Sequence, residues 1–157
     1  MQISEVIKKK PISLRNNDNL GDVLKTFSKN KISSIPIVDG RKNLVGIVTK
    51  ADIIKLLDVH SKIQESYSKT FPLVLGILRG QEHFENVEGS IKKILVVPVS
   101  EFMTKRVYSI EPDRDVYDAI RKMSKYNVES LPVVKKRKLI GIVTRTDIIN
   151  KIEKDVS

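Results

Sequence analysis

The chain has 157 residues, of which 40% are hydrophobic and 31% charged, so it can fold around one ordinary core or two small fused cores. This composition excludes a large multidomain enzyme and a disordered tail, and the lack of cysteine excludes disulfides, thiolate zinc sites and cysteine nucleophiles. The net charge is +10, with the positive excess in residues 1–55 and 99–157, and this favours partners that carry phosphate groups.

The N-terminus has neither the apolar core nor the cleavage site of a secretory signal. The most apolar segment, residues 71–78, is interrupted by Pro72 and Gly76 and is far shorter than the roughly 20 residues that a membrane-spanning helix needs. We therefore expect a cytoplasmic protein without a membrane partner.

The first part of the chain predicts a β-α-β-β-α unit. A leading strand is expected near residues 12–14, and residues 19–27 carry apolar side chains at helical spacing after Asp18, the expected helix cap. Residues 35–48 contain two β-branched runs around a turn, which predicts a hairpin. Thr49 is expected to open a second helix.

The middle of the chain, residues 58–98, is predicted to be a connecting helical insert. We expect a helical pair that covers the flank of the fold or mediates dimerisation; a ligand-gated lid is the alternative. His60 and His83 have no cysteine companions and no H-E-x-x-H spacing, so no metal site is expected.

The last part of the chain repeats the first. The segment S-I-P-I-V at residues 34–38 recurs as S-L-P-V-V at 130–134, and G-I-V-T-K-A-D at 46–52 recurs as G-I-V-T-R-T-D at 141–147. A second amphipathic helix is expected over residues 115–123, with Asp113 as its cap. A period this long differs from that of a solenoid and implies two tandem modules packed as a pair.

We therefore predict an α+β fold of two pseudo-symmetric β-α-β-β-α repeats packed through their sheets. The first repeat is expected to span residues 1–57 and the second residues 99–157. Each repeat alone is too small to be comfortably stable, so the two are expected to share an interface. Clefts between such halves are common places for small ligands.

The repeated signature admits two interpretations. A threonine followed three residues later by an aspartate fits a capping box, which closes the first turn of a helix. The same helix start also suits a phosphate, because unpaired N–H groups and a neighbouring cation lie there, while the aspartate can accept hydrogen bonds from two ribose hydroxyls. The signature residues are Thr49, Lys50 and Asp52 in the first copy and Thr144, Arg145 and Asp147 in the second.

Two further features fit a nucleoside ligand. Gly46 and Gly141 are expected to let the backbone approach a bound molecule closely. Pro36 and Pro132 stand at the same place in the two copies. Apolar side chains beside these prolines are expected to form a slot for the base, with free backbone groups nearby that can bind the edge of a purine. The side chains predicted for this slot are Ile35, Ile37, Leu131 and Val133.

Together, the two copies resemble a tandem pair of cystathionine-β-synthase (CBS) domains, also called a Bateman module. The resemblance rests on the repeated hydrophobic-Pro-hydrophobic-Val and Gly-hydrophobic-hydrophobic-Thr-x-x-Asp motifs, and on V-S-E-F-M-T at residues 99–104. It implies a non-enzymatic regulatory module that requires no cofactor and binds AMP, ADP, ATP or S-adenosylmethionine in two clefts. It also implies a homodimer that acts on an effector protein, whose identity stays open.

Transferred by position, the resemblance assigns the threonine and aspartate of each copy to one cleft. Lys8 stands where Thr104 stands in the second copy, and Pro11 stands where Val107 stands. We therefore expect the two clefts to differ, with the second copy closer to the family pattern. The residues that the resemblance places near the base are Ser34, Ile35, Thr104, Val107, Ser130 and Leu131.

The basic runs Lys8–Lys10 and Lys135–Lys138 leave a second function open, that of a small nucleic-acid-binding regulatory protein. Scarce aromatic residues and the lack of a recognition-helix motif weigh against it. The sequence has no nucleophile elbow, no P-loop and no paired carboxylates with a histidine, so no catalytic residues are predicted.

Overall fold

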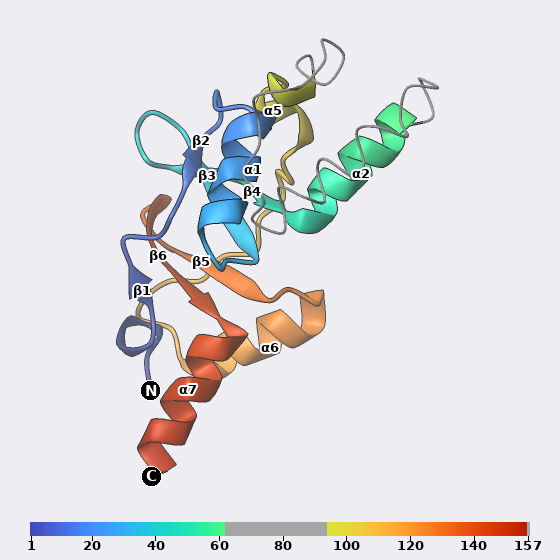
Figure 1. Ribbon diagram of the computed structural model, residues 1–157. Coiled ribbons are helices and arrows are strands. Elements are labelled where there is room, and N and C mark those ends of the chain that lie inside the picture. Colours follow the sequence, from blue (N-terminus) through green and yellow to red (C-terminus); the bar gives the residue numbers. More distant parts are fainter. Residues whose placement is uncertain (62–93, 157) are drawn as a thin grey trace.

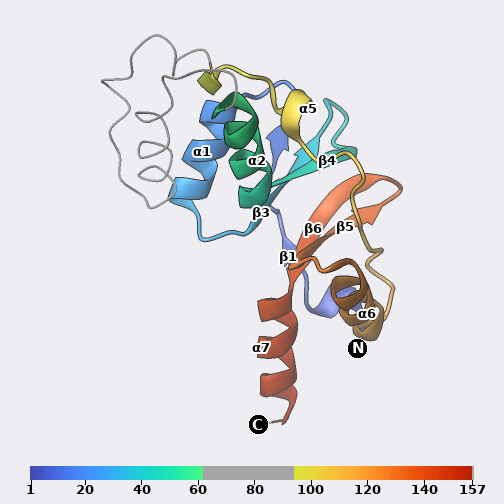
Figure 2. The ribbon, with the colours of Figure 1, turned by 90° about the vertical axis from the view of Figure 1, so that its right-hand side faces the viewer.

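The computed structural model describes residues 1–61 and 94–156, which form two β-sheets flanked by helices (Figures 1 and 2). The sheets have the strand orders β2-β3-β4 and β1-β6-β5. The strands are β1 (Lys8–Lys9), β2 (Leu14–Arg15), β3 (Ser34–Val38), β4 (Leu44–Thr49), β5 (Ser130–Lys135) and β6 (Lys138–Thr144). The helices are η1 (Ile3–Glu5), α1 (Leu20–Lys29), α2 (Lys50–Ser61), α5 (Val99–Phe102), α6 (Val116–Tyr126) and α7 (Arg145–Val156). The predicted α+β class and the paired repeats are confirmed.

The two hairpins have the same register. In β3–β4 the residue after the proline, Ile37, lies opposite Gly46, and in β5–β6 Val133 lies opposite Gly141. Each hairpin has a register shift directly after that pair. The leading strand β2 runs parallel to β3, and a single parallel bridge from Ile110 replaces it in the second repeat. The duplicated sequence therefore gives duplicated sheet geometry.

The apolar faces of the two predicted helices pack on separate cores. The sequence places four apolar residues at helical spacing in each helix, and in α1 all four are buried, which confirms that face. In α6 three of the four are buried, but the fourth, Ile120, is 36% exposed, so the expected apolar face is wrong at that residue. The buried residues are Leu20, Val23, Leu24 and Phe27 in α1 and Val116, Ala119 and Met123 in α6.

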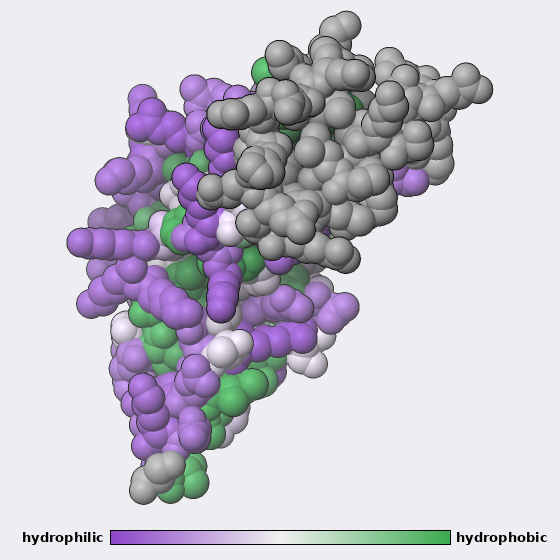
Figure 3. All heavy atoms as spheres, viewed as in Figure 1, coloured by the Kyte–Doolittle hydropathy of each residue, from purple (hydrophilic) through white to green (hydrophobic). Residues whose placement is uncertain are grey.

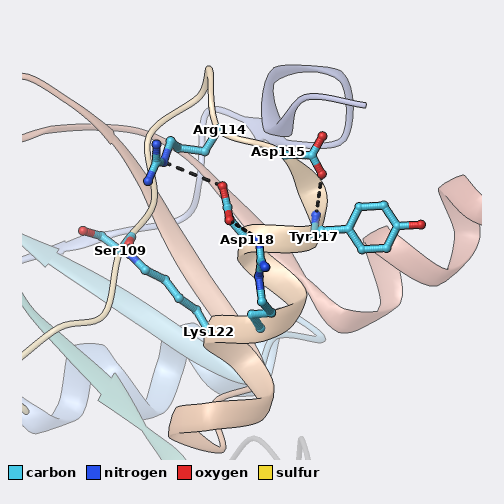
Figure 4. Close-up of polar contacts among 7 residues, drawn as sticks. Ser109, Arg114, Asp115, Tyr117, Asp118 and Lys122 are labelled. Atoms are coloured by element: carbon cyan, nitrogen blue, oxygen red, sulfur yellow. Dashed lines mark hydrogen bonds and ion pairs between the residues drawn. The ribbon is translucent and has the colours of Figure 1, made fainter.

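The helix caps differ from those predicted. The cap of α1 is Asn19, which accepts a hydrogen bond from the Asp22 amide at 3.1 Å. The cap of α6 is Asp115, which accepts from the Tyr117 amide at 2.8 Å (Figure 4). Asp18 lies before the helix and accepts from the Arg15 amide at 2.7 Å instead. The predictions of Asp18 and Asp113 were wrong because α1 begins one residue later, and α6 two residues later, than these caps would require.

The opening segments of the two repeats are exchanged. Ile3 is fully buried in the core of the second repeat, and β1 pairs antiparallel with β6, so the N-terminal segment lies against the second sheet (Figures 1 and 2). Conversely, Val99 is fully buried in the core of the first repeat, and Thr104 forms an antiparallel bridge with Ile47 of β4. The packed units therefore do not coincide with the sequence repeats, and neither unit is complete without the other.

This exchange gives Gly46 and Gly141 a role that the sequence did not suggest. A Cβ atom at Gly46 would lie 2.4 Å from Sδ of Met103, and one at Gly141 would lie 2.6 Å from Cδ1 of Ile7. Met103 and Ile7 both belong to exchanged segments. The prediction that these glycines make room for a ligand is wrong; they make room for the opening segment of the other repeat.

Most of the predicted insert lies outside the described residues, including His83, and the lid and dimerisation interpretations lie there too. His60 is part of α2, but its side chain is not described. Within the described ranges, no helix combines the length and the apolar character that crossing a bilayer requires.

The glycine contacts predict a graded loss of stability on substitution. We expect Gly141→Ala to lower the free energy of unfolding by about 1–3 kcal/mol, because its Cβ would also lie 3.0 Å from the backbone oxygen of Lys8. Gly46→Ala should lower it less, because the long Met103 side chain can move aside. Urea denaturation of both variants measures the difference.

The matched control is Gly40→Ala, since nothing lies within 4 Å of a Cβ at Gly40. It should change stability by less than about 0.5 kcal/mol. Equal stability of Gly40→Ala and Gly141→Ala would contradict the packing role of Gly141.

Candidate functional site

Two clefts open between the repeats, with volumes of about 720 Å³ and 930 Å³. Both volumes lie in the range of small-molecule pockets in proteins. We call the larger one the Asp52 cleft and the smaller one the Asp147 cleft, after the carboxylate at the helix start beside each. The Asp52 cleft is lined by residues that include Thr49, Lys50, Asp52, Thr104, Arg106, Val107, Tyr108 and Ser130. The Asp147 cleft is lined by residues that include Lys8, Lys9, Lys10, Pro11, Ile12, Thr144, Arg145 and Thr146.

Each cleft joins the helix start of one repeat to the opening segment of the other. Thr104 of the second repeat reaches Asp52, and Lys8 of the first repeat reaches Asp147. The exchange of opening segments causes this arrangement. We expected the second copy to have the better preserved cleft. This expectation is wrong because neither cleft belongs to one copy: Thr104 and Val107 of the second copy line the cleft of Asp52, not that of Asp147.

Asp52 holds the start of α2 in a capping box. Its Oδ2 accepts hydrogen bonds from the Thr49 amide at 2.8 Å and the Thr49 hydroxyl at 3.0 Å. Its Oδ1 accepts from the Thr104 hydroxyl at 3.0 Å. The capping-box interpretation is thus correct, but it engages only one carboxylate oxygen, so the other is available to groups across the cleft.

Asp147 repeats this geometry with a cation in place of the hydroxyl. Its Oδ2 accepts from the Thr144 amide at 3.0 Å and the Thr144 hydroxyl at 2.6 Å, and its Oδ1 pairs with Nζ of Lys8 at 2.9 Å. Burial would raise the pKa of the Asp147 carboxyl, but the hydrogen bonds from Thr144 and Lys8 outweigh burial and lower the pKa below its ordinary value.

Both helix starts are equipped to attract an anion. The amides of Ala51 and Thr146, which both line their clefts, have no hydrogen-bond partner among the residues that the structure describes. Exposed Lys50 and Arg145 follow the capping threonines and line the same clefts. Free amides and cations at a helix N-terminus suit a phosphate group.

The predicted apolar slot for a base is not formed by the side chains assigned to it. All four are fully buried in the two cores and line neither cleft, because their side chains pack among the other core residues of each repeat. This prediction is wrong. The four residues are Ile35, Ile37, Leu131 and Val133.

The serines before the two prolines lie at the centre of the interface. Ser34 and Ser130 are 5% and 6% exposed, and their hydroxyl oxygens are 2.7 Å apart. Ser34 borders both clefts and Ser130 borders the Asp52 cleft. One hydroxyl donates a hydrogen bond to the other, so both buried groups have a partner, and the pair marks the point where the pseudo-symmetric repeats meet.

Several residues that border the clefts were not predicted from the sequence. Residues 31–33 and Glu129 border both clefts, and Tyr108 borders the Asp52 cleft, where it stacks on Tyr126 with ring centroids 3.8 Å apart. Of these residues, Tyr108 could have been predicted from the sequence, because it directly follows Val107, which was expected to line a cleft. The others lie before the two serines in loops that no motif singles out. No group of three or more potential metal ligands occurs in the described ranges.

Comparison with known families identifies the repeats. Residues 3–59 and 99–154 each match the CBS domain family. The chain belongs to the CBS domain family. The two matches correspond to the two sequence repeats, so the protein contains a CBS pair.

The relatives of this CBS pair differ greatly in length. An uncharacterized protein of Methanocaldococcus jannaschii is 36% identical over 151 residues, which cover 93% of this chain and 88% of that protein. The L-aspartate semialdehyde sulfurtransferase of the same organism is 29% identical over 93% of this chain, but the match covers only 22% of the enzyme. The chain therefore spans about a fifth of that enzyme and most of the first relative.

Solved CBS pairs share the fold. The CBS domain pair of protein MJ0100, in complex with 5-methylthioadenosine and S-adenosyl-L-methionine, has a TM-score of 0.68 at 26% identity, covering 99% of this chain and 98% of that one. CBSX2, in complex with AMP, has a TM-score of 0.73 at 19% identity with the same coverage of both chains, a likeness that concerns the fold alone.

The contacts of Asp147 predict a change in its titration. Because its pKa is lower in the folded protein than in the unfolded chain, ionised Asp147 stabilises the fold above the ordinary aspartate pKa of about 3.9, and this contribution is lost as the pH falls through the folded value. We expect Lys8→Met to raise the pKa of Asp147, as measured by carboxyl NMR.

Lys151→Met is the control, because Lys151 pairs with Asp155 at 2.7 Å on the far end of α7. It should leave the titration of Asp147 unchanged. An unaltered Asp147 titration in Lys8→Met would show that the ion pair does not form in solution.

Proposed function

We propose that the CBS pair is a non-enzymatic regulatory module that binds an adenosine compound between its repeats and thereby modulates a partner protein. The observation that carries the proposal is the composite geometry of the clefts: a helix N-terminus with free amides and cations lies next to a carboxylate. This arrangement fits a phosphate beside a ribose. Two CBS pairs of the same fold were solved with AMP and with S-adenosyl-L-methionine, which supports this ligand class.

The clefts also provide a physical route to regulation. Each cleft is built from both repeats, so a ligand that spans it contacts both. Such a ligand favours whichever relative position of the repeats gives it better contacts, and it shifts the equilibrium only by that difference in affinity. A partner protein that binds only one relative position of the repeats would then bind more or less tightly when the ligand is present. The identity of that partner, an effector protein, stays open.

We infer that the module acts as a homodimer in the cytoplasm. An apolar stripe on α7 supports the dimer: Ile149, Ile152 and Val156 are 64%, 44% and 83% exposed and lie on one face of the helix. Figures 1 and 2 show that this helix projects away from both sheets. A second copy of the chain would shield the stripe from water.

The proposal predicts that Asp52 is required for ligand binding. We expect Asp52→Ala to weaken the binding of AMP, ADP, ATP or S-adenosylmethionine, whichever binds, by about 10–100-fold in Kd, because hydrogen bonds from the ribose to a carboxylate are lost. Isothermal titration calorimetry measures the change.

Asp115→Ala is the matched control. It removes the capping carboxylate of α6, which borders neither cleft, so it tests whether loss of a helix cap alone affects binding. It should bind like the wild type. Unchanged affinity in both Asp52→Ala and Asp147→Ala would contradict the ribose role of these residues.

One observation favours the second candidate, nucleic-acid binding. The tips of the two hairpins are joined by backbone hydrogen bonds, from the Leu44 amide to the Arg137 oxygen at 3.0 Å and from the Leu139 amide to the Lys42 oxygen at 3.1 Å. Hydrophilic residues cover this side of the molecule (Figure 3). The cations gathered there are Arg41, Lys42, Lys135, Lys136, Arg137 and Lys138.

Charge reversal at the tips separates the two functions. None of these cations borders a cleft, so we expect the double variant Lys136→Glu/Arg137→Glu to keep the wild-type affinity for adenosine compounds. Nucleic-acid binding instead requires a salt-dependent retention of DNA or RNA in a gel shift that this variant abolishes. If the gel shift shows such binding and the wild type binds no adenosine compound, nucleic-acid binding replaces the proposed function.

A further inference from the structure

The two clefts differ at the position that faces the helix carboxylate. Lys8 lies opposite Ile142 in the register of β1 and β6, and Thr104 lies opposite Ile47 in the equivalent bridge to β4. The fold thus places the two side chains at matching points of the two clefts. One is an uncharged hydroxyl, and the other is an ammonium group.

The atom that each side chain contacts is the one that a ligand needs. In both aspartates Oδ2 is occupied by the capping box, and Oδ1 is the oxygen that contacts the side chain from the other repeat. At Asp52 this oxygen accepts from the Thr104 hydroxyl, which can rotate and can itself accept a hydrogen bond. A ribose hydroxyl can therefore share Oδ1 with Thr104 and gain a second partner there.

At Asp147 the same oxygen is held by a cation. Lys8 Nζ is 2.9 Å from Oδ1, and the Asp147 side chain is only 9% exposed. An ammonium group donates hydrogen bonds but accepts none, so, unlike the Thr104 hydroxyl, it cannot accept a hydrogen bond from a second ribose hydroxyl. A ligand that displaced Lys8 would leave a nearly buried carboxylate without its cation, which is unfavourable.

A second difference between the clefts points the same way. Tyr108 borders the Asp52 cleft, and its ring is fixed by the stack on Tyr126 with an interplanar angle of 12°. The equivalent position in the Asp147 cleft is Ile12. Only the Asp52 cleft therefore offers an aromatic side chain for a purine among the residues that the structure describes.

We propose that Lys8 excludes nucleosides from the Asp147 cleft, so that each chain binds one adenosine compound, in the Asp52 cleft. This inference rests on the proposed function and adds which cleft is used and which residue decides it. Lys8 is a specificity-determining residue, since it competes with the ribose for Asp147 and leaves Asp52 untouched.

Exchanging the two side chains tests this inference. Calorimetry with AMP, and separately with S-adenosylmethionine, should give one site per wild-type chain and two in Lys8→Thr. Thr104→Lys should weaken binding at least tenfold. In the double exchange Lys8→Thr/Thr104→Lys, the single site should move to the other cleft, so that adding Asp147→Ala, and not Asp52→Ala, abolishes it.

Lys8→Met removes the cation without supplying a hydroxyl. A second site in this variant shows that the ion pair is what excludes the ligand. Both Lys8 variants remove the cation paired with Asp147, so thermal denaturation checks that these variants and Thr104→Lys are folded.

Two outcomes overturn the inference while leaving the proposed function intact: two equal sites in the wild type, or a single unchanged site in Lys8→Thr that Asp52→Ala still abolishes. Absence of binding in the wild type and in every Lys8 variant overturns the proposed function itself. The stoichiometry of wild type and Lys8→Thr therefore distinguishes the two failures.

Discussion

Ile3 and Val99 each fill a core that is built mainly from the other repeat, and the rest of the structure depends on this exchange. A unit of about 50 residues buries too little apolar surface to be stable alone. Donating an opening segment to the neighbour enlarges both cores and fixes how the repeats lie against each other. Gly46 and Gly141 permit the exchange because a side chain at either position would collide with the incoming segment.

The exchange also explains why the two clefts exist. It brings the opening residues of one repeat to the helix start of the other, so each cleft has one wall from each half of the molecule. The hydroxyl pair of Ser34 and Ser130 lies between the clefts, with the two oxygens 2.7 Å apart. A change in the relative position of the repeats must therefore alter both clefts, and a molecule bound in either cleft resists that change.

The two interpretations of the Thr-x-x-Asp signature turn out to be compatible. One carboxylate oxygen holds the threonine and closes the helix turn, and this fixes the orientation of the other oxygen toward the cleft. A structural cap thus pre-orients a potential ligand contact, which reduces the entropy that binding must overcome. The same cap leaves the amides of Ala51 and Thr146 free for an anion.

The amino-acid sequence by itself determined the duplication, the order of the elements, the apolar faces of the helices and the signature residues at the helix starts. These features are local, because periodicity, turns and caps depend on neighbours in the chain. The apolar residues beside the prolines were misassigned, since a buried strand and an apolar pocket wall have the same sequence pattern.

Only the tertiary structure decided which segments share a cleft. The sequence alignment of the copies matched Lys8 with Thr104 correctly, but it suggested that each acts within its own repeat. The contacts of Lys8 with Asp147 and of Thr104 with Asp52 cross between repeats. Such contacts depend on long-range packing of the exchanged segments, which leaves no periodic signal in the chain, so the difference between the clefts became visible only once both cores were formed.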